Sequence, residues 1–462
     1  MGWEPLGECR AEKSPSPPPS PREKGYPWAM AEFRVLHCAD LHLDSPFIGI
    51  GQMDAEAAER LRQATFASFR RAINVAIERD VHLVTVGGDV YDGADHGLHS
   101  AMRFRDELQR LSEAGIACCI VAGNHDPLGK RNLTASLPAG CELFTSQVGS
   151  MPIEVDGQKV ATVHGASFPT RNVSENLAAK LVDGLEGGPG LHIALLHCNV
   201  GSDAHHDDYA PCSLEELKGS SFDAWLLGHV HERKVLCEAH PLVLYPGNIQ
   251  GRSIREVGER GVTLICFDGD AAPTTEFIAT SEVVWFEGET SIEGLDQVED
   301  LIERIDGDFE SLQESFPQAQ SLVVRWHLTG RGDLHQVLAA TGEDVIEALR
   351  SRARERQVPI WVEKLKFATQ PALDLAELRQ QAGFVSMVIE CAEGEAAGDN
   401  EDNDSLTREE LLERFAPLWS VSGIGGSLDK LKARIEDDPT AIRDLIDRAM
   451  LTAVSALTEG GE

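Results

Sequence analysis

Short apolar runs rich in β-branched residues alternate along the chain with longer segments in which apolar residues recur every three or four positions. Residues 33–39, 82–86 and 116–121 have the pattern of buried strands. Residues 54–79 and 99–114, which lie between these runs, carry the spacing of one helix face. This β-α-β-α-β order predicts a sheet that is covered by helices. Further strands are expected at 160–164, 193–196, 224–227, 242–245 and 262–267.

The same pattern divides the chain into a large domain, a small domain and a tail. We place the large domain at residues 31–275, and further strand-like and helical segments predict a smaller α/β domain at 282–390. Acidic residues among Gly and Ala predict a flexible linker at 391–405. Helical spacing of Leu and Ile then predicts a helical tail at 406–462.

Composition narrows the class of protein. The Pro-rich residues 1–30 are expected to be disordered, and Met30 is an alternative start of the protein. The net charge of −35 excludes a protein that attracts nucleic acid through its overall charge, so a polyanionic substrate needs a local basic strip or bound cations. The ten Cys form no CxxC pair, which favours a reduced, cytoplasmic protein. We expect no membrane span, because no apolar run is long enough.

Side chains that bind metals follow five of the predicted strands directly. Because ligands bind outside the carboxyl ends of strands in open α/β sheets, we expect these side chains to meet in one crevice at one rim of the sheet. By contrast, His37, His82, His164 and His192 lie within or beside strands and are expected to be core or edge residues. The five strand-end motifs are Asp40-Leu41-His42, Gly88-Asp89, Gly123-Asn124-His125-Asp126, His197 and Gly228-His229-Val230-His231.

The residue types in these motifs indicate a catalytic metal site. Carboxylate, amide and imidazole groups without thiolates suit Mn, Fe or Zn in an open site. Seven ligands are too many for one ion, so we expect two ions about 3.5–4 Å apart that share one carboxylate. The seven expected ligands are Asp40, His42, Asp89, Asn124, His197, His229 and His231.

The five motifs, in this order over residues 33 to about 270, resemble the calcineurin-like metallophosphoesterase superfamily. The resemblance implies a metallophosphoesterase β-sandwich flanked by helices, with Asp89 bridging two metals. It also implies that His125 protonates or stabilises the leaving oxygen while metal-activated water attacks phosphorus, and that Asp126 orients or anchors the loop beside it. One metal would be held by Asp40, His42, Asp89 and His231, and the other by Asp89, Asn124, His197 and His229.

A narrower resemblance is to the SbcD and YhaO group of DNA repair exonucleases, with YhaO the closer. It rests on Gly88 to Asp92, Tyr245 to Asn248 and the run from Gln250 to Gly261. It implies that the domain at 282–390 is a capping domain and that the tail docks on an SMC-like ATPase of the SbcC type. Eukaryotic and archaeal members have His where Asp92 stands, so the catalytic role of that position is not carried over.

Two basic residues beside the strand ends are candidates for substrate binding. The guanidinium groups of Arg252 and Arg255 suit contacts with a phosphodiester backbone, and ordinary surface charge is the alternative interpretation.

We therefore expect a metal-dependent phosphodiesterase that hydrolyses DNA as a 3′ to 5′ exonuclease, with endonuclease activity left open. Two Mn²⁺ ions are the preferred cofactors, and Fe, Zn or Mg are alternatives. The expected partners are DNA and an SMC-like ATPase, and a homodimer is left open. Two other hypotheses remain at this point: a phosphodiesterase for small nucleotide or cyclic phosphodiesters, and a non-catalytic assembly subunit of the ATPase complex.

Overall fold

A computed structural model describes most of the large and small domains. The predicted N-terminal extension lies outside the described residues, as do most of the predicted linker and all but five residues of the predicted tail. None of the described helices combines the length and apolarity needed to cross a membrane. The described residues are 32–45, 55–93, 98–128, 136–201, 209–269, 271–373, 375–380, 383–396, 450, 451, 453, 454 and 457.

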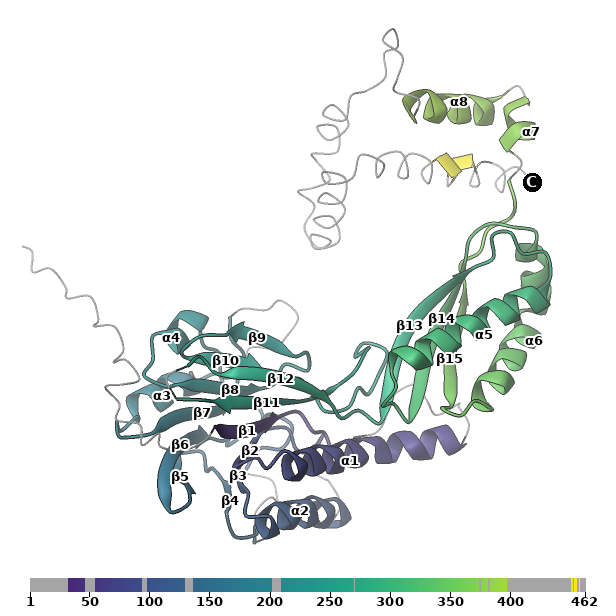
Figure 1. The fold of residues 1–462 in the computed structure, drawn as a ribbon. Coiled ribbons are helices and arrows are strands. Elements are labelled where there is room, and N and C mark those ends of the chain that lie inside the picture. Colours follow the sequence, from purple (N-terminus) through teal and green to yellow (C-terminus); the bar gives the residue numbers. More distant parts are fainter. Residues whose placement is uncertain are drawn as a thin grey trace, which may run out of the picture. The chain divides into compact units, whose positions relative to one another are not determined.

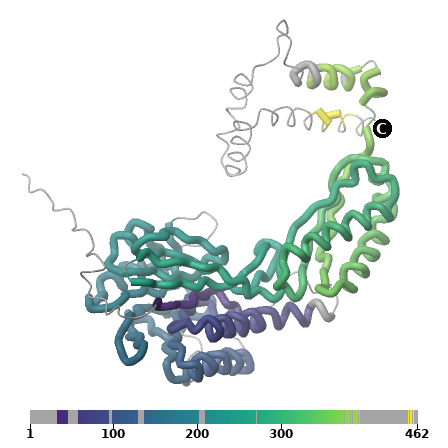
Figure 2. The backbone as a smooth tube through the Cα atoms, viewed as in Figure 1, coloured from purple at the N-terminus to yellow at the C-terminus, as the bar shows by residue number. Residues whose placement is uncertain are grey.

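Two six-stranded sheets form the large domain (Figure 1). The first sheet has the order β12-β11-β1-β2-β3-β4, in which β1 to β4 are parallel and β11 and β12 are antiparallel additions. β1, in purple in Figure 2, pairs with the much later, green β11. In this pair Phe33 lies opposite Phe267. The strands are β1 (Phe33–Cys38), β2 (Leu83–Gly87), β3 (Ala117–Val121), β4 (Cys141–Leu143), β11 (Gly261–Phe267) and β12 (Thr274–Ala279).

The second sheet has the order β5-β6-β7-β8-β10-β9. Its central strands β6, β7, β8 and β10 are parallel, and the outer strands β5 and β9 are antiparallel to their neighbours. The strands are β5 (Gly149–Val155), β6 (Gln158–Ala166), β7 (Leu191–His197), β8 (Ala224–Gly228), β9 (Lys234–Cys237) and β10 (Leu242–Tyr245).

Apolar side chains between the two sheets make the central core. Val35 and Ile265 of the first sheet share one buried cluster with Leu195 and Leu226 of the second. Burying such side chains contributes roughly 1.5–3 kcal/mol each, which drives the two sheets together. Both faces of the central strands are buried, and their sequences are therefore continuous apolar runs instead of alternating ones.

Helices cover the outer face of each sheet (Figure 1). α1 (Ala55–Glu78) and α2 (Leu98–Glu113) bury Phe69, Ile73 and Leu108 against the first sheet. α3 (Leu177–Asp183) and α4 (Leu214–Lys218) cover the second sheet with Leu181 and Leu217. α4 is short, but Ser213 and Glu216 form a capping box that satisfies its first backbone donors.

The predicted α/β sandwich flanked by helices is thus confirmed. The metal-binding side chains were also predicted to lie at one rim of a single sheet, and that prediction is wrong. The parallel strands β1 to β3 and β6 to β8 belong to different sheets, which face each other across the central core. The hydrophobic pattern is the same for one long sheet and for two stacked sheets, because both bury the two faces of each central strand. Several elements, among them β5, β9 and β12, were also not expected from the pattern.

The small α/β domain has the order strand, helix, strand, helix, strand. β13 (Val283–Ser291), β14 (Ser321–Thr329) and β15 (Ile360–Phe367) form a three-stranded sheet, with α5 (Val298–Ser315) and α6 (Leu334–Arg354) between them in the chain. Phe309 of α5 packs edge-on against Trp326 of β14, with the ring centroids 5.0 Å apart.

By compactness the chain divides into two units. The first comprises residues 1–288, 306–326 and 349–365. Within it, Leu61 and Ala64 of α1 pack with Trp285 of β13 and Trp361 of β15.

The second unit comprises residues 289–305, 327–348 and 366–462. It contains α7 (Leu375–Gln380) and α8 (Phe384–Ala396), where Ile389 packs with Met450 and Val454. α8 therefore continues into the first residues of the predicted linker.

His37 is one of the predicted core histidines and joins the two sheets. It is fully buried; Nδ1 lies 2.9 Å from the hydroxyl of Thr85, and Nε2 lies 3.0 Å from the carbonyl oxygen of Leu227 in the second sheet. The carbonyl can only accept, so Nε2 carries the proton of a neutral ring. Burial lowers the pKa of His37 to about 4.

We predict that His37 makes the fold sensitive to acid. In the unfolded chain a histidine takes up a proton near pH 6.5, whereas folded His37 does so near pH 4. Between these values the unfolded state binds more protons, so the free energy of unfolding falls as pH falls, by on the order of 2–3 kcal/mol from this residue. Urea unfolding of the metal-free protein at pH 7 and pH 4.5 measures this loss.

The variant His37→Gln should lose less stability between the two pH values than the wild type. His99→Gln, which changes an exposed histidine on α2, should lose as much as the wild type. Equal losses in all three proteins would contradict the prediction.

Candidate metal centre

The five motifs lie at the carboxyl ends of strands from both sheets: β1, β2 and β3 in the first, β7 and β8 in the second. Backbone hydrogen bonds tie the loops together. The N–H of Asp40 donates to the carbonyl oxygen of Gly88 (3.0 Å), and that of His42 donates to the carbonyl oxygen of Asp89 (3.0 Å). In the second sheet, the N–H of Cys198 donates to the carbonyl oxygen of Gly228 (3.2 Å). The motifs therefore converge as expected, although from two sheets.

Four of the expected ligands have a left-handed backbone. The φ angles are 51° at Asp40, 44° at His42, 48° at Asp89 and 107° at His229. Such a conformation costs a residue other than glycine about 1–3 kcal/mol and persists only where the surroundings enforce it. At each of these residues the sharp turn directs the backbone away from its strand. A polar side chain can therefore point toward the site directly after the strand ends.

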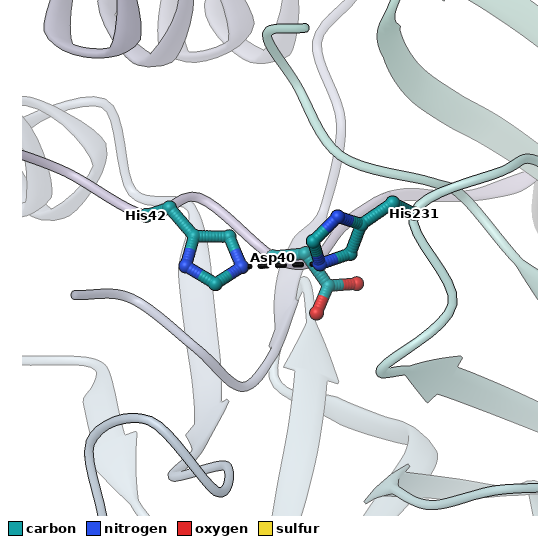
Figure 3. Close-up of side chains that lie close together, drawn as sticks. All are labelled: Asp40, His42 and His231. Atoms are coloured by element: carbon teal, nitrogen blue, oxygen red, sulfur yellow. Dashed lines mark hydrogen bonds between the residues drawn. The ribbon is translucent and has the colours of Figure 1, made fainter. Parts of the chain in front are cut away.

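His42, His231 and Asp40 form the first cluster (Figure 3). The Nε2 atoms of His42 and His231 lie 3.2 Å apart. The Nδ1 atom of His42 lies 3.0 Å from Oδ1 of Asp92, and Nδ1 of His231 lies 2.7 Å from Oε1 of Glu256. Glu256 accepts the Nδ1 proton of His231, so Nε2 of His231 presents its lone pair beside Asp40 and next to Nε2 of His42, which is the arrangement of a metal-binding histidine pair.

Asp89, His197 and Asn124 form the second cluster. Oδ2 of Asp89 lies 3.5 Å from Nε2 of His197 and 3.9 Å from Nε2 of His42, so this carboxylate stands between the two clusters. Nδ1 of His197 donates to the carbonyl oxygen of Gly87 (2.8 Å), which leaves a lone pair on Nε2, only 2.8 Å from Oδ1 of Asn124. A cation that both groups bind would offset the repulsion between these two lone pairs. A proton on Nε2 is disfavoured, because burial lowers the pKa of His197 to about 3.

His229 completes the second cluster. Its ring centroid lies 5.3 Å from that of His197, and its backbone N–H donates to both carboxylate oxygens of Asp40, at 3.1 Å each. The loop after β8 thus places His231 in the first cluster and the ring of His229 beside His197 of the second.

Buried carboxyl groups dominate the electrostatics. Burial raises the pKa of Asp40 to about 7 and also raises the pKa of Asp89. Ionising both groups in a dry site requires a compensating positive charge. Divalent cations would provide that charge, and the donor set of carboxylate, imidazole and amide groups is one that such ions accept. The residues therefore fit the expected metals.

His125 lies at the edge of the clusters. Its side chain is 31% exposed, and Nδ1 lies 3.2 Å from Oδ1 of Asp92. The hydrogen bond with Asp92 raises the pKa of His125. Burial opposes ionisation of Asp92, but hydrogen bonds from His125 and His42 outweigh it and hold the pKa of this carboxyl well below its usual range. His125 is thus placed to carry a proton.

Asp126 is placed beneath the site and not in it. Its carboxylate accepts backbone N–H groups of Gly123 (2.8 Å), Val90 (2.8 Å) and Tyr91 (3.4 Å). These bonds fix the loop after β3 to the loop after β2. Asp126 is 3% exposed and is not among the residues that line the cavity, so its contacts are those of a loop anchor.

A cavity of about 810 Å³ opens onto the two clusters. Arg255 is exposed and lines it, whereas Arg252 is not among its lining residues and points inward to Asp92. Arg171 and Lys234 also line the cavity.

Glu256 is a site residue that the sequence patterns did not identify, and Asp92 has contacts that they did not predict. Glu256 falls inside a run that was noted only for its resemblance to the YhaO group. An isolated carboxylate in a loop has no spacing that distinguishes it from a surface residue. Only the fold shows that each lies within hydrogen-bond distance of a histidine of the site.

Comparison with known proteins supports the same interpretation. Residues 33–233 match the calcineurin-like phosphoesterase family, and residues 285–370 match the middle domain of the metallophosphoesterase YhaO. The chain is 30% identical over 353 residues to the uncharacterized metallophosphoesterase YhaO of Bacillus subtilis (strain 168), which covers 76% of this chain and 85% of that protein. The chain belongs to the calcineurin-like metallophosphoesterases. As a metallophosphoesterase it is a hydrolase of phosphate esters.

More distant relatives of this metallophosphoesterase have names that concern DNA. It is 27% identical over 260 residues to the DNA double-strand break repair protein Mre11 of Sulfurisphaera tokodaii, covering 54% of this chain and 63% of that protein. Among solved structures, a dimetal phosphatase from Danio rerio is 13% identical and covers 54% of this chain and 99% of that one. Its TM-score of 0.31 is too low to carry an argument.

We predict that Gly123→Ala disrupts metal binding. A Cβ atom at Gly123 would collide with Oδ1 of Asp89, the carboxylate between the two clusters. Displacing this carboxylate should weaken Mn²⁺ binding by about tenfold or more, as measured by isothermal titration calorimetry.

Gly93→Ala is the matched control, because a Cβ atom at Gly93 meets no atom within 4 Å. It should bind Mn²⁺ as the wild type does. Wild-type affinity in Gly123→Ala would show that the Asp89 carboxylate does not need its present position.

Proposed function

We propose that this metallophosphoesterase hydrolyses phosphodiester bonds of DNA, as a metal-dependent 3′ to 5′ exonuclease acting in DNA repair. The observation that carries the proposal is the convergence of metal-type side chains beside His125, of which Asp89, Asn124, His229 and His231 line one cavity. The relatives named as DNA double-strand break repair proteins support DNA as the substrate class.

In this proposal the two clusters hold the two ions, with Asp89 shared between them. Asp40, His42 and His231 complete the first site, and Asn124, His197 and His229 complete the second. When bound, divalent ions of this kind polarise the phosphate and make a water molecule more acidic. Mn²⁺ is the preferred ion.

The remaining chemistry falls to side chains of the protein. When both ring nitrogens of His125 are protonated, Asp92 accepts the Nδ1 proton and Nε2 can donate its proton to the leaving oxygen of the substrate, which leaves a neutral His125. The positively charged side chains of Arg171, Lys234 and Arg255 at the cavity would bind neighbouring phosphates of the strand. A local basic strip of this kind offsets the net charge of −35, which otherwise repels DNA.

We predict that His125→Gln and Asp89→Asn abolish hydrolysis for different reasons. With Mn²⁺ and end-labelled duplex DNA, His125→Gln should lower kcat by about 10²–10⁴-fold but keep Mn²⁺ affinity, because His125 holds a proton and no metal. Asp89→Asn should lose both activity and Mn²⁺ affinity. Quantifying released nucleotides from 3′-labelled and 5′-labelled strands measures the rate and the polarity.

The same preparation tests the alternative substrates. Turnover of a cyclic nucleotide that exceeds turnover of DNA at one Mn²⁺ concentration would favour a phosphodiesterase for small nucleotides. Undiminished nucleotide release in both variants would refute the proposed site altogether.

We also propose that an SMC-like ATPase of the SbcC type is the partner, which the repair-protein relatives support. The full-length protein mixed with such an ATPase from the same organism should co-elute in size-exclusion chromatography. A chain truncated after residue 396 should elute separately if the predicted tail makes the contact. Equal co-elution of both forms would contradict a role of the tail.

A further inference from the structure

Arg252 lies between two carboxylates that each contact a histidine of the metal centre. Its Nη1 atom lies 3.2 Å from Oδ1 of Asp92, and its Nη2 atom lies 3.8 Å from Oε1 of Glu256. The side chains are largely enclosed, with exposed fractions of 18% for Arg252, 29% for Asp92 and 15% for Glu256. The three groups therefore form one partly buried chain of charges, minus-plus-minus.

The two carboxylates also contact histidines of the metal centre. Asp92 contacts Nδ1 of His125 (3.2 Å) and Nδ1 of His42 (3.0 Å). Glu256 contacts Nδ1 of His231 (2.7 Å). The orientation of each imidazole thus depends on a carboxylate, and both carboxylates depend on the same guanidinium.

Neighbouring groups hold this assembly in place. The hydroxyl of Ser45 donates to Oδ2 of Asp92 (2.8 Å) and accepts from Nη1 of Arg252 (3.1 Å). Oε2 of Glu256 accepts the backbone N–H of Arg252 (2.7 Å) and Nδ2 of Asn248 (3.1 Å). With these partners fixed, the planar fork of Arg252 can reach both carboxylates at once, which the single ammonium of a lysine cannot do.

We propose that Arg252 is a positioning residue: it holds Asp92 and Glu256 in place and through them orients His125 and His231, instead of binding the DNA backbone. The inference rests on the proposed function for the roles of these two histidines. It separates Arg252 from Arg255, which is exposed and lines the cavity. The two arginines are three positions apart and perform different tasks.

The proposal predicts which kinetic constant changes when each arginine is removed. Removing Arg252 leaves two carboxylates without their shared cation, so both can turn away from their histidines, and the loss falls on kcat for every substrate. Removing Arg255 takes away a contact that only an extended polyanion makes, so the loss falls on KM and Kd for DNA.

The experiment compares Arg252→Ala, Arg252→Lys and Arg255→Ala on bis-p-nitrophenyl phosphate and on an oligonucleotide duplex with Mn²⁺. Arg252→Ala should lower kcat by about 10–100-fold on both substrates, with the Kd for DNA, measured in EDTA, within about twofold of the wild type. Its Mn²⁺ affinity should also fall, because His231 loses its fixed orientation. Arg252→Lys should recover less than half of the lost rate, whereas Arg255→Ala should raise the Kd for DNA.

Arg325→Ala is the matched control for loss of a partly buried ion pair. Arg325 is 22% exposed and forms a bidentate pair with Glu363 between β14 and β15, at 2.9 and 2.7 Å. It should lower the melting temperature as Arg252→Ala does but leave kcat unchanged. If Arg252→Ala fails to fold, Arg252→Lys provides the same comparison of kcat with Kd.

A variant of Arg252 that keeps the wild-type rate on bis-p-nitrophenyl phosphate and binds DNA more weakly would overturn the proposal and make Arg252 a substrate contact. Full activity of Arg252→Lys would overturn the requirement for a fork. If the wild-type protein hydrolyses bis-p-nitrophenyl phosphate but not DNA, the proposed function fails, and the role of Arg252 is still decided on the small substrate.

Discussion

Negative charge buried where two sheets meet is the constraint that organises this protein. Asp40 and Asp89 are almost inaccessible to solvent, yet neither has a lysine or arginine within ion-pair distance among the described residues. Their close partners are histidines whose lone pairs point to the same space. A buried carboxylate of this kind is stable when ionised only if a cation lies beside it. The site is therefore built to be completed by cations, and the fold must hold the carboxylates together until those cations bind.

The sandwich provides this rigidity at the expense of local strain. The central core fixes the strands, and the ligands follow within a few residues of their ends, so little loop is left to move. The left-handed backbone at Asp40, His42, Asp89 and His229 is unfavourable in isolation, and backbone hydrogen bonds between the loops enforce it. Asp126 contributes to the same end, since it clamps two loops without lining the cavity. Stability and function are thus in tension at the same few residues.

The expected metal ligands could be predicted from the sequence more readily than the arrangement of the strands in sheets. Strand-end position and residue type were enough to select Asp40 or His197, because both signals are local. The division into two sheets could not be predicted, because a strand buried on both faces has the same composition in one long sheet and in two stacked sheets. One missed element did have a signal. Asp156 and Gly157, with φ angles of 51° and 75°, form the tight turn between β5 and β6, and an Asp-Gly pair between apolar runs predicts such a hairpin. Glu256 had no comparable local signal, since its importance arises only from the distance to His231.

The arrangement of charge also explains how an acidic protein can have a phosphate-binding cavity. Cations bound deep in the site would attract the phosphate that reacts, whereas arginines around the site would attract phosphates farther away. In water with physiological salt, charges more than about 8 Å apart on the surface are largely screened, so the distant part of the overall charge of −35 acts only weakly at the cavity. A guanidinium enclosed between two carboxylates, as Arg252 is, contributes almost no net field toward a substrate, because its charge is already balanced. Attraction of a phosphate must then come from the metals and from the basic groups whose charge is not so enclosed. Among those that line the cavity, Arg255 and Arg171 are the exposed ones.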